Sequence, residues 1–245
     1  MLPKKCYNIK DMAQRNIPLV PGEYFHIYNR GNSKQKIFLD NKDKDRFVKL
    51  LYLSNSTKNI NFRDDIIDAK LDVWHFEKGK SLVSIGAWVL MPNHFHIYLI
   101  SPIPGIGEKE DRNQLNNITK FMNKLSVSYV KYFNQRHERT GSLFEGPFKS
   151  KLVKDENQAK YLFSYIHLNP VKLIQKDWKE KGIKNKEYAI RFLREYKYSS
   201  YLDYLKINRI EDLILDKKAF PDYFSTKEKI QKEIFEWLSF PLSLG

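Results

Sequence analysis

The alternation of apolar and polar residues divides the chain into recognisable strands and helices. Aromatic and β-branched residues between two glycines predict a strand over 22–31. Apolar residues three or four positions apart predict helices over 43–54 and about 113–134. Two further apolar runs, 82–90 and 94–100, predict strands joined by a Pro-Asn turn. The first half of the chain is therefore expected to form a sheet with helices between its strands.

The second half of the chain is predicted to be mainly helical. A short extended segment at 142–153 precedes a helix over 156–168. This helix is expected to kink or end at Asn169, because Pro170 has no N–H to donate and disfavours helical geometry in the residue before it. Strands first, with helices between and after them, predict an α+β fold with an antiparallel sheet.

No sharp linker is evident, so one domain with two flanking segments is the simplest division. We expect a basic N-terminal arm over 1–20, a domain over 21–205 and a helical C-terminal extension over 206–245. A chain of 245 residues is long enough for a substantial core.

Charge and cysteine content narrow the choice of partner and compartment. The chain has 43 Lys and Arg residues against 29 Asp and Glu residues, a formal net charge of +14. This balance favours a polyanionic partner, nucleic acid before an anionic membrane surface, although a Lys-rich surface alone would also produce it. The lone Cys6 excludes an internal disulfide, and no apolar segment has the length of a signal peptide or a membrane span. We expect a bacterial-type cytoplasmic protein, associated with the nucleoid and not with a membrane.

A strand that begins with two histidines carries the strongest chemical signal. Side chains alternate between the faces of a strand, so His94 and His96 should project from one face. Phe95, Ile97 and Leu99 should point into the core. Two imidazoles on a rigid strand make half of a metal site. The sequence has no HExxH or CxxC motif to complete it, so two polar residues on a solvent face remain the alternative.

The helix that ends at Asn169 offers the missing groups. Tyr165 and Asn169 are i and i+4, so they lie on one face of a helix. If that face meets the histidine strand, Asn169 could supply an oxygen ligand and Tyr165 a covalent nucleophile. A phenol with a pKa of about 10 needs help at neutral pH, which a cation that polarises a phosphate would supply. Spacing alone does not single out Tyr165 among 15 tyrosines, because core packing also explains residues such as Tyr129.

Five stretches, taken in order, resemble the single-tyrosine transposases of the HUH endonuclease superfamily, in the branch related to REP-associated tyrosine transposases. The combination of MPNHFH with YIHLNPVK about 70 residues later is specific, and the matches run from about 20 to 205. The segment over 55–80 is longer than the usual connection in the family, and the tail after about 205 has no clear counterpart. The matching stretches are EYFHIYNRGNSKQKIF (23–38), WVLMPNHFHIYL (88–99), RTGSLFEGPFKS (139–150), YLFSYIHLNPVK (161–172) and YKYSSYLDYL (196–205).

This resemblance implies a fold, an activity and a set of site residues. The fold would be a ferredoxin-like or RRM-like antiparallel sheet with helices on one face, and 21–205 would be the HUH endonuclease domain. His94 and His96 would bind a divalent metal, Mg or Mn, with Asn169 as the third, amide ligand. Tyr165 would be the catalytic nucleophile, forming a 5′-phosphotyrosine link to DNA and leaving a free 3′-OH. The strand could then be rejoined without ATP.

The substrate implied by the resemblance is single-stranded DNA, often beside a hairpin. A basic protein with exposed aromatic residues suits such a substrate. Relatives include dimers and monomers, so the resemblance leaves open whether this chain is a monomer or a homodimer. The candidate DNA contacts, all in or beside the matched stretches, are Arg30, Lys34, Arg139, Lys149 and Lys151.

Two other functions remain as alternatives. One is a domesticated relative of the same fold that binds DNA or RNA without cutting it, although the histidine and tyrosine positions are all present here. The other is a two-histidine phosphoesterase, which would need two separate His-x-Thr/Ser motifs, and the sequence has no such pair.

Overall fold

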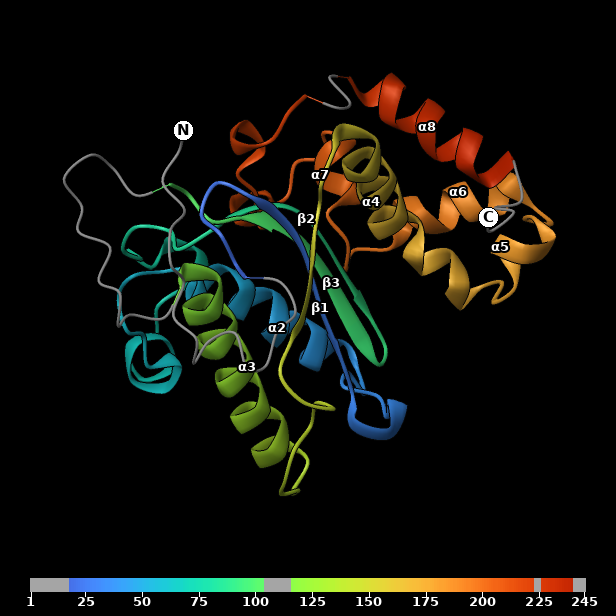
Figure 1. The fold of residues 1–245 in the computed structure, drawn as a ribbon. Helices are drawn as coiled ribbons and strands as arrows, with labels where there is room; N and C mark the ends of the chain where they lie inside the picture. Colours follow the sequence, from blue (N-terminus) through green and yellow to red (C-terminus); the bar gives the residue numbers. More distant parts are fainter. Residues whose placement is uncertain (1–17, 104–115, 223–225, 240–245) are drawn as a thin grey trace.

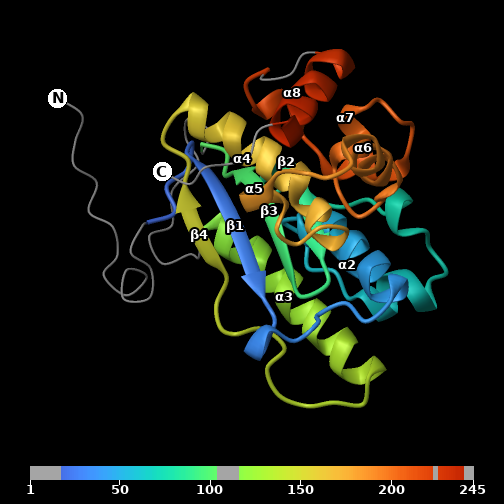
Figure 2. The same ribbon diagram turned by 90° about the vertical axis from the view of Figure 1, so that its right-hand side faces the viewer.

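In the computed structural model, which describes residues 18–103, 116–222 and 226–239, four strands form one antiparallel sheet. The strands lie side by side in the order β2-β3-β1-β4 (Figure 2). The main helix of each half, α2 or α3, follows β1 or β3, which makes the βαββαβ arrangement of ferredoxin-like folds. The predicted α+β class with an antiparallel sheet is confirmed. The strands are β1 (Tyr24–Arg30), β2 (Ser84–Met91), β3 (His94–Ile100) and β4 (Lys149–Leu152).

The helices agree closely with the periodicity of the sequence. The predicted helices over 43–54 and 156–168 correspond to α2 and α4, and the long predicted helix corresponds to α3. The α-helices are α2 (Asn41–Ser54), α3 (Asn117–Arg136), α4 (Glu156–Leu168), α5 (Trp178–Lys181), α6 (Lys186–Glu195), α7 (Tyr201–Tyr204) and α8 (Lys227–Ser239). The shorter helical turns are η1 (Asn32–Lys34), η2 (Phe62–Asp68), η3 (Val73–His75), η4 (Asn169–Leu173), η5 (Ile210–Ile214) and η6 (Lys217–Ala219).

One face of the sheet packs on α2 and α3 (Figure 1). Phe95, Ile97 and Leu99 of β3 are fully buried, as the alternation predicted. The ring of Phe47 in α2 lies 5.0 Å from that of Phe95 and 4.9 Å from that of Tyr129 in α3, measured between centroids. Aromatic pairs at this spacing add to the stability gained from area burial alone. This layer forms the larger part of the hydrophobic core.

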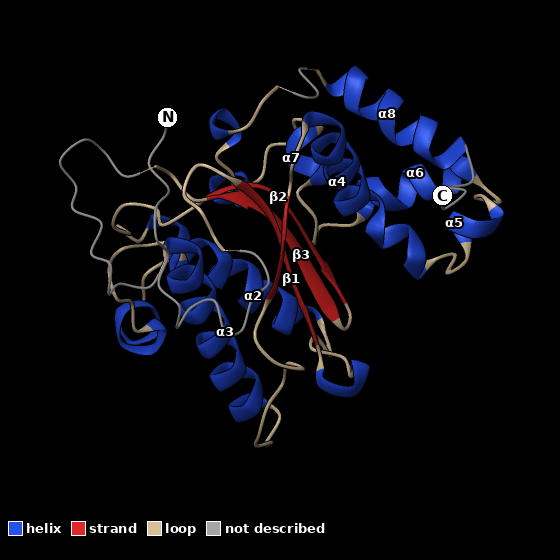
Figure 3. Cartoon of the chain, viewed as in Figure 1, coloured by secondary structure: helices blue, strands red, loops and turns tan. Residues whose placement is uncertain are grey.

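The opposite face of the sheet also carries helices, whereas the resemblance implied helices on one face only. Helix α4 packs over β2 and β3, and α6 and α8 lie outside it, so the sheet stands between two groups of helices (Figure 3). Both faces carry helices because β3 has buried side chains on both of its faces. Tyr98, on the same face as His94 and His96, is fully buried. Helix α4 contacts mainly β2 and β3, and it reaches β1 where Tyr165 lies against His26.

A single hydroxyl joins the edge of the sheet to α4. Residues 198–200, in the last of the five matched stretches, pair with β2, where the Ser200 N–H donates to the Trp88 carbonyl at 2.9 Å. The Ser200 hydroxyl accepts from the Trp88 N–H at 2.9 Å and bonds Nε2 of His167 at 2.8 Å. His167 belongs to α4 and is fully buried. These bonds fix α4 relative to β2, and they also cover a strand edge that would otherwise be open to pairing with another chain.

The C-terminal segment packs on the rest of the chain through α8. Ile230, Ile234 and Leu238 are each 1% exposed, as the helical spacing predicted. Helix α8 contacts α4 and α6. The division of the chain at 20 and 205 stays a prediction, and most of the basic arm, with Cys6, lies outside the described residues. Within the described ranges, no helix combines the length and apolar character needed to cross a membrane.

The buried histidine of α4 predicts how stability depends on pH. Burial lowers the pKa of His167 to about 3, whereas an imidazole in an unfolded chain titrates near about 6.5. Between these values only the unfolded chain binds the proton, so the free energy of unfolding falls as the pH falls from about 6.5 toward about 3. His167→Gln keeps a polar group for Ser200 but cannot titrate. Between pH 7 and pH 5 it should lose about 2 kcal/mol less stability than the wild type. Urea unfolding at both pH values measures the difference, and equal losses would contradict the prediction.

Candidate functional site

The two histidines of β3 lie together beneath α4. Their ring centroids are 5.0 Å apart, as expected for positions i and i+2 of a strand. His96 is only 6% exposed and His94 is half-buried. The alternative in which both are polar residues on a solvent face is therefore wrong for His96, because α4 covers that face.

Hydrogen bonds fix which nitrogen of His94 is free. The amide nitrogen of Asn93 donates to the Lys34 carbonyl at 3.2 Å, which turns its oxygen toward His94. That oxygen lies 2.6 Å from Nδ1 of His94. Since an amide oxygen only accepts, Nδ1 of His94 carries the proton and Nε2 keeps its lone pair. The Pro-Asn turn thus sets the imidazole in the form that can bind a metal.

Asn169 lies at the end of α4, as the spacing predicted, and is 1% exposed. Neither the oxygen nor the nitrogen of its amide has a hydrogen-bond partner among the described residues, and Nε2 of His96 also has none. Buried polar atoms without partners are rare and costly, so these atoms are candidates to bind an ion, a ligand or water. The orphaned atoms of His96 and Asn169, with the free Nε2 of His94, fit a cation held by two imidazoles and an amide.

Among the described residues, no carboxylate joins His94 and His96 in a group of three metal ligands. In the part of the chain that the structure describes, no three His, Cys, Asp or Glu side chains form a group that could hold a metal ion. The set of two imidazoles and one amide oxygen is therefore electrically neutral. Magnesium and manganese prefer oxygen ligands, and magnesium is commonly held partly by substrate phosphates. A neutral donor set suits a cation that arrives with, or is completed by, a phosphate.

The ring of Tyr165, on α4, lies against two histidines, His96 of β3 and His26 of β1. Its ring centroid is 5.4 Å from that of His96 and 6.3 Å from that of His26, both in edge-to-face geometry. The helix that carries it begins at Asp155, whose carboxylate accepts from the Gln158 N–H at 2.8 Å, a normal N-cap. The structure thus brings together Tyr165, His94, His96 and Asn169. What each side chain does chemically is a separate question.

Three further residues of the site were not among the sequence-based candidates. Nε2 of His26, on β1, lies 2.8 Å from Nδ1 of His96. The ammonium of Lys179 lies 4.2 Å from the ring centroid of Tyr165, and that of Lys172 lies 6.0 Å from it. Lys172 is within a matched stretch and His26 was predicted to share a face with two tyrosines, so both had a weak signal. Lys179 had none, since it follows a loop.

The electrostatics of the site keep its imidazoles uncharged. Burial, with the charge of Lys172, lowers the pKa of His94 to about 4, whereas the Asn169 side chain, which lies close to His94 without meeting hydrogen-bond geometry, raises it. Burial, followed by the neighbouring histidines, lowers the pKa of His96 well below its usual value. Burial, with the charge of Lys172, also lowers the pKa of Lys179 to about 8. Neutral imidazoles surrounded by cationic side chains suit an anionic ligand better than a proton.

Three of the five candidate DNA contacts share the face of the histidines. Arg30 is directly opposite His94 in the β1–β3 pairing, while Lys149 and Lys151 pair with β1 on its other side. Residues directly opposite in an antiparallel pair point to the same face. Lys149 and Lys151 are exposed, so with Arg30 they form a cationic strip along β1 and β4. Glu145 lies within this strip and bonds both Arg30 and Lys149.

The other two candidate DNA contacts lie elsewhere. Lys34 is exposed in the turn that follows β1, and its carbonyl is held by Asn93 next to the histidine strand. Arg139 follows α3, where its guanidinium lies 5.5 Å from the ring centroid of Phe133, on the far face of the sheet. Lys34 therefore stands near the end of the strip, and Arg139 stands apart from it.

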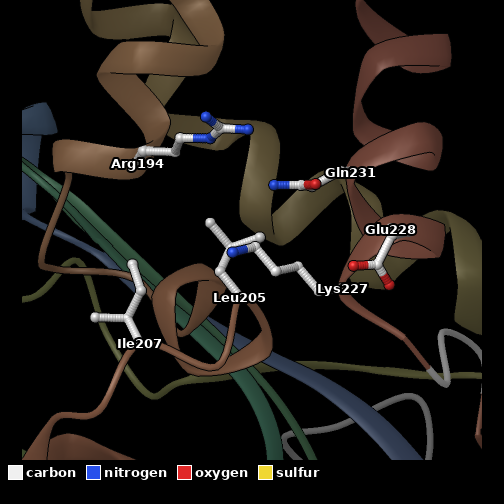
Figure 4. A pocket seen from close by; sticks show the side chains of 6 residues that line it. All are labelled: Arg194, Leu205, Ile207, Lys227, Glu228 and Gln231. Atoms are coloured by element: carbon white, nitrogen blue, oxygen red, sulfur yellow. The ribbon is translucent and has the colours of Figure 1, made fainter.

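A cavity of about 450 Å³ is found well away from this site. It lies between α6, α8 and the chain after α7, with Arg194 and Gln231 reaching toward each other across it (Figure 4). No residue of the histidine strand or of α4 lines it. The candidate site is therefore separate from this cavity.

Comparisons with known proteins find a distant structural likeness. No protein-family model matches the chain, and no curated protein matches it. Among solved structures, the chain is similar to a REP-associated tyrosine transposase bound to a REP hairpin, at 13% sequence identity and a TM-score of 0.43. The likeness covers 82% of this chain and 90% of that chain.

A site kept for a ligand should cost stability when the ligand is absent. Asn169→Leu replaces the unpartnered amide by an apolar group of the same branching. Without metal it should stabilise the protein by about 1 kcal/mol, because two buried polar atoms without partners are removed. Urea unfolding in a chelator measures this. With added Mn²⁺, the melting temperature should rise for the wild type and not for Asn169→Leu.

Asn55 provides the matched control for this substitution. It is also buried, but its amide makes three hydrogen bonds, to the Val83 carbonyl and from the N–H groups of Leu82 and Val83. Asn55→Leu should therefore destabilise the protein by about 2 kcal/mol or more. Similar destabilisation by Asn169→Leu and Asn55→Leu would show that the Asn169 amide is satisfied and not reserved for a ligand.

Proposed function

We propose that the protein is a metal-dependent endonuclease and transposase that cleaves and rejoins single-stranded DNA through Tyr165. One observation carries the proposal. Tyr165 on α4 lies against the rings of His96 and His26, next to buried polar atoms of His96 and Asn169 that have no partner among the described residues. The resemblance of the five matched stretches to single-tyrosine transposases of the HUH endonuclease superfamily agrees with that chemistry.

Nε2 of His94, Nε2 of His96 and the amide oxygen of Asn169 would hold the cation, Mg or Mn. When bound, this ion would polarise a non-bridging oxygen of the scissile phosphate, which makes the phosphorus more open to attack. The protein's own part is to keep both imidazoles neutral and rigid. The strand fixes their spacing, and the turn at Asn93 fixes the proton of His94.

Cleavage would begin with the phenol oxygen of Tyr165. It attacks the phosphorus and forms a new P–O bond, while the bond from phosphorus to the 3′-oxygen breaks. The phenol proton is lost to solvent, and the departing 3′-oxygen takes up a proton to become a free 3′-OH. The product keeps one phosphodiester on the tyrosine, attached to the 5′ end of the downstream fragment. Attack by a 3′-OH reverses the step and rejoins the strand.

Charges around the site suit a DNA backbone. The ammonium groups of Lys172 and Lys179 lie over the ring of Tyr165, where they would stabilise its phenolate and the attacked phosphate. The strip of Arg30, Lys149 and Lys151 would hold the strand that leads to the site. Half-buried tyrosines of β1 on the same face offer surfaces for base stacking. The resemblance implies a hairpin beside the cleavage point.

The nucleophile can be tested by trapping the covalent product. A single-stranded oligonucleotide taken from the flanks of the gene, with a hairpin and a 3′ fluorescent label, should give a labelled adduct that survives denaturing electrophoresis with Mn²⁺. Tyr165→Phe and a chelator should each abolish the adduct, because each removes a group that the step needs. Tyr161→Phe is the matched control, since Tyr161 stacks on Tyr165 one turn earlier and is 41% exposed. It should retain the adduct.

Two outcomes would contradict the proposal in different ways. An adduct that persists in Tyr165→Phe would assign the nucleophile to another residue. Binding without any adduct, unaffected by chelator or by Tyr165→Phe, would favour the non-cleaving DNA- or RNA-binding module.

The role of Lys179 predicts an effect on rate. Lys179→Met keeps an apolar stem over the ring but removes the charge. Adduct formation under single-turnover conditions should slow about 10-fold, as expected for loss of a partly desolvated cation beside a developing charge. Lys181→Met is the control, because Lys181 lies on the same short helix and is 73% exposed in an ion pair with Asp177. Equal rates for the two variants would exclude a catalytic role for Lys179.

A further inference from the structure

His26 is the polar neighbour of His96 that the proposed chemistry has not yet used. It lies on β1, next to β3 in the sheet (Figure 2), and its side chain shares the face of the two histidines, because Tyr28, two residues further on, is directly opposite His96. Its Nε2 is 2.8 Å from Nδ1 of His96, a normal hydrogen-bond distance. The ring centroids of His26 and His96 are 5.0 Å apart. A bond between two imidazoles needs exactly one proton between the two nitrogens.

That proton has two possible positions. If it is on Nε2 of His26, the single proton of neutral His96 must sit on its Nε2. That atom is buried and has no partner among the described residues, so a buried N–H would be left without an acceptor. If the proton is on Nδ1 of His96, Nε2 of His96 carries a lone pair instead. Orphaned buried N–H groups are rarer than acceptors with a free lone pair, which favours the second arrangement.

The arrangement at His94 supports the same choice. There the Asn93 oxygen receives the Nδ1 proton and leaves Nε2 free. With His26 accepting from Nδ1 of His96, both imidazoles would present the same nitrogen to the same place. A metal-bound histidine typically donates its other N–H to such a neighbour, which sets its tautomer and orientation.

We infer that His26 is a positioning residue, which accepts the Nδ1 proton of His96 and thereby keeps Nε2 of His96 free to bind a divalent cation. The inference rests on the proposed function for the identity of the ligand. The tautomer itself belongs to the metal-free protein and can be observed without catalysis.

Long-range ¹H–¹⁵N correlation spectra of the ¹⁵N-histidine-labelled, metal-free protein report which ring nitrogen of each histidine is protonated. His96→Gln assigns the His96 signals. His96 should be protonated on Nδ1 in the wild type and in His26→Gln, whose amide oxygen can also accept. In His26→Phe the Nε2-protonated form should appear, and Mn²⁺ affinity measured by calorimetry should fall about 10-fold. His75→Gln is the control, since His75 is 81% exposed and should change neither result.

Each other outcome decides against the inference or separates it from the function. His96 protonated on Nε2 in the wild type would overturn it, as would an unchanged tautomer and affinity in His26→Phe. Loss of Mn²⁺ binding in His26→Gln, with the tautomer retained, would make His26 a ligand and not a positioning residue. If the tautomer and affinity behave as expected but Tyr165 forms no adduct, the positioning role stands and the proposed cleavage fails.

Discussion

The position of α4 over the sheet depends on the Ser200 hydroxyl. It bonds the Trp88 N–H at the edge of β2 and the buried His167 of α4, so it links a strand edge to a helix that is distant in sequence. A directed bond of this kind fixes the position of a helix more sharply than apolar contacts do. Tyr165 and Asn169 stand two residues to either side of His167. The same bond therefore sets their distance from the histidine strand.

On the second face of the sheet, closely packed side chains lie beside buried polar atoms that have no hydrogen-bond partner among the described residues. Elsewhere in the described core the buried amide of Asn55 makes three hydrogen bonds. At the candidate site, Asn169 and Nε2 of His96 make none. These two unpartnered groups belong to the residues that the proposed cation would bind. The lysines around these neutral groups favour the binding of an anion over the binding of a proton.

Much of this arrangement could be predicted from local patterns. Alternation along the strand put His94 and His96 on one face, and the i, i+4 spacing put Tyr165 beside Asn169, with Pro170 ending the helix. These are properties of neighbouring residues, which a single sequence contains. Whether the helix face meets the strand depends on contacts between distant segments, and no periodicity encodes them. The resemblance of the matched stretches, and not spacing, suggested that meeting.

The residues that prediction missed have the same explanation. His26 reaches His96 across the β1–β3 pairing, whose register follows from the whole sheet, and Lys179 arrives after a loop. Conversely, Arg139 was predicted as a DNA contact because it belongs to a matched stretch, but it lies on the α3 side of the sheet. Helices on both faces, and not on one, follow from a central strand that is buried on both sides.

The central claim is that the groups gathered beneath α4 form one cation site. Anomalous diffraction from crystals grown with Mn²⁺ tests it most directly. The account predicts a single strong peak within coordination distance of Nε2 of His94, Nε2 of His96 and the amide oxygen of Asn169, facing the phenol of Tyr165. A peak elsewhere on the protein with none among these atoms, at a Mn²⁺ concentration that supports adduct formation, would contradict it.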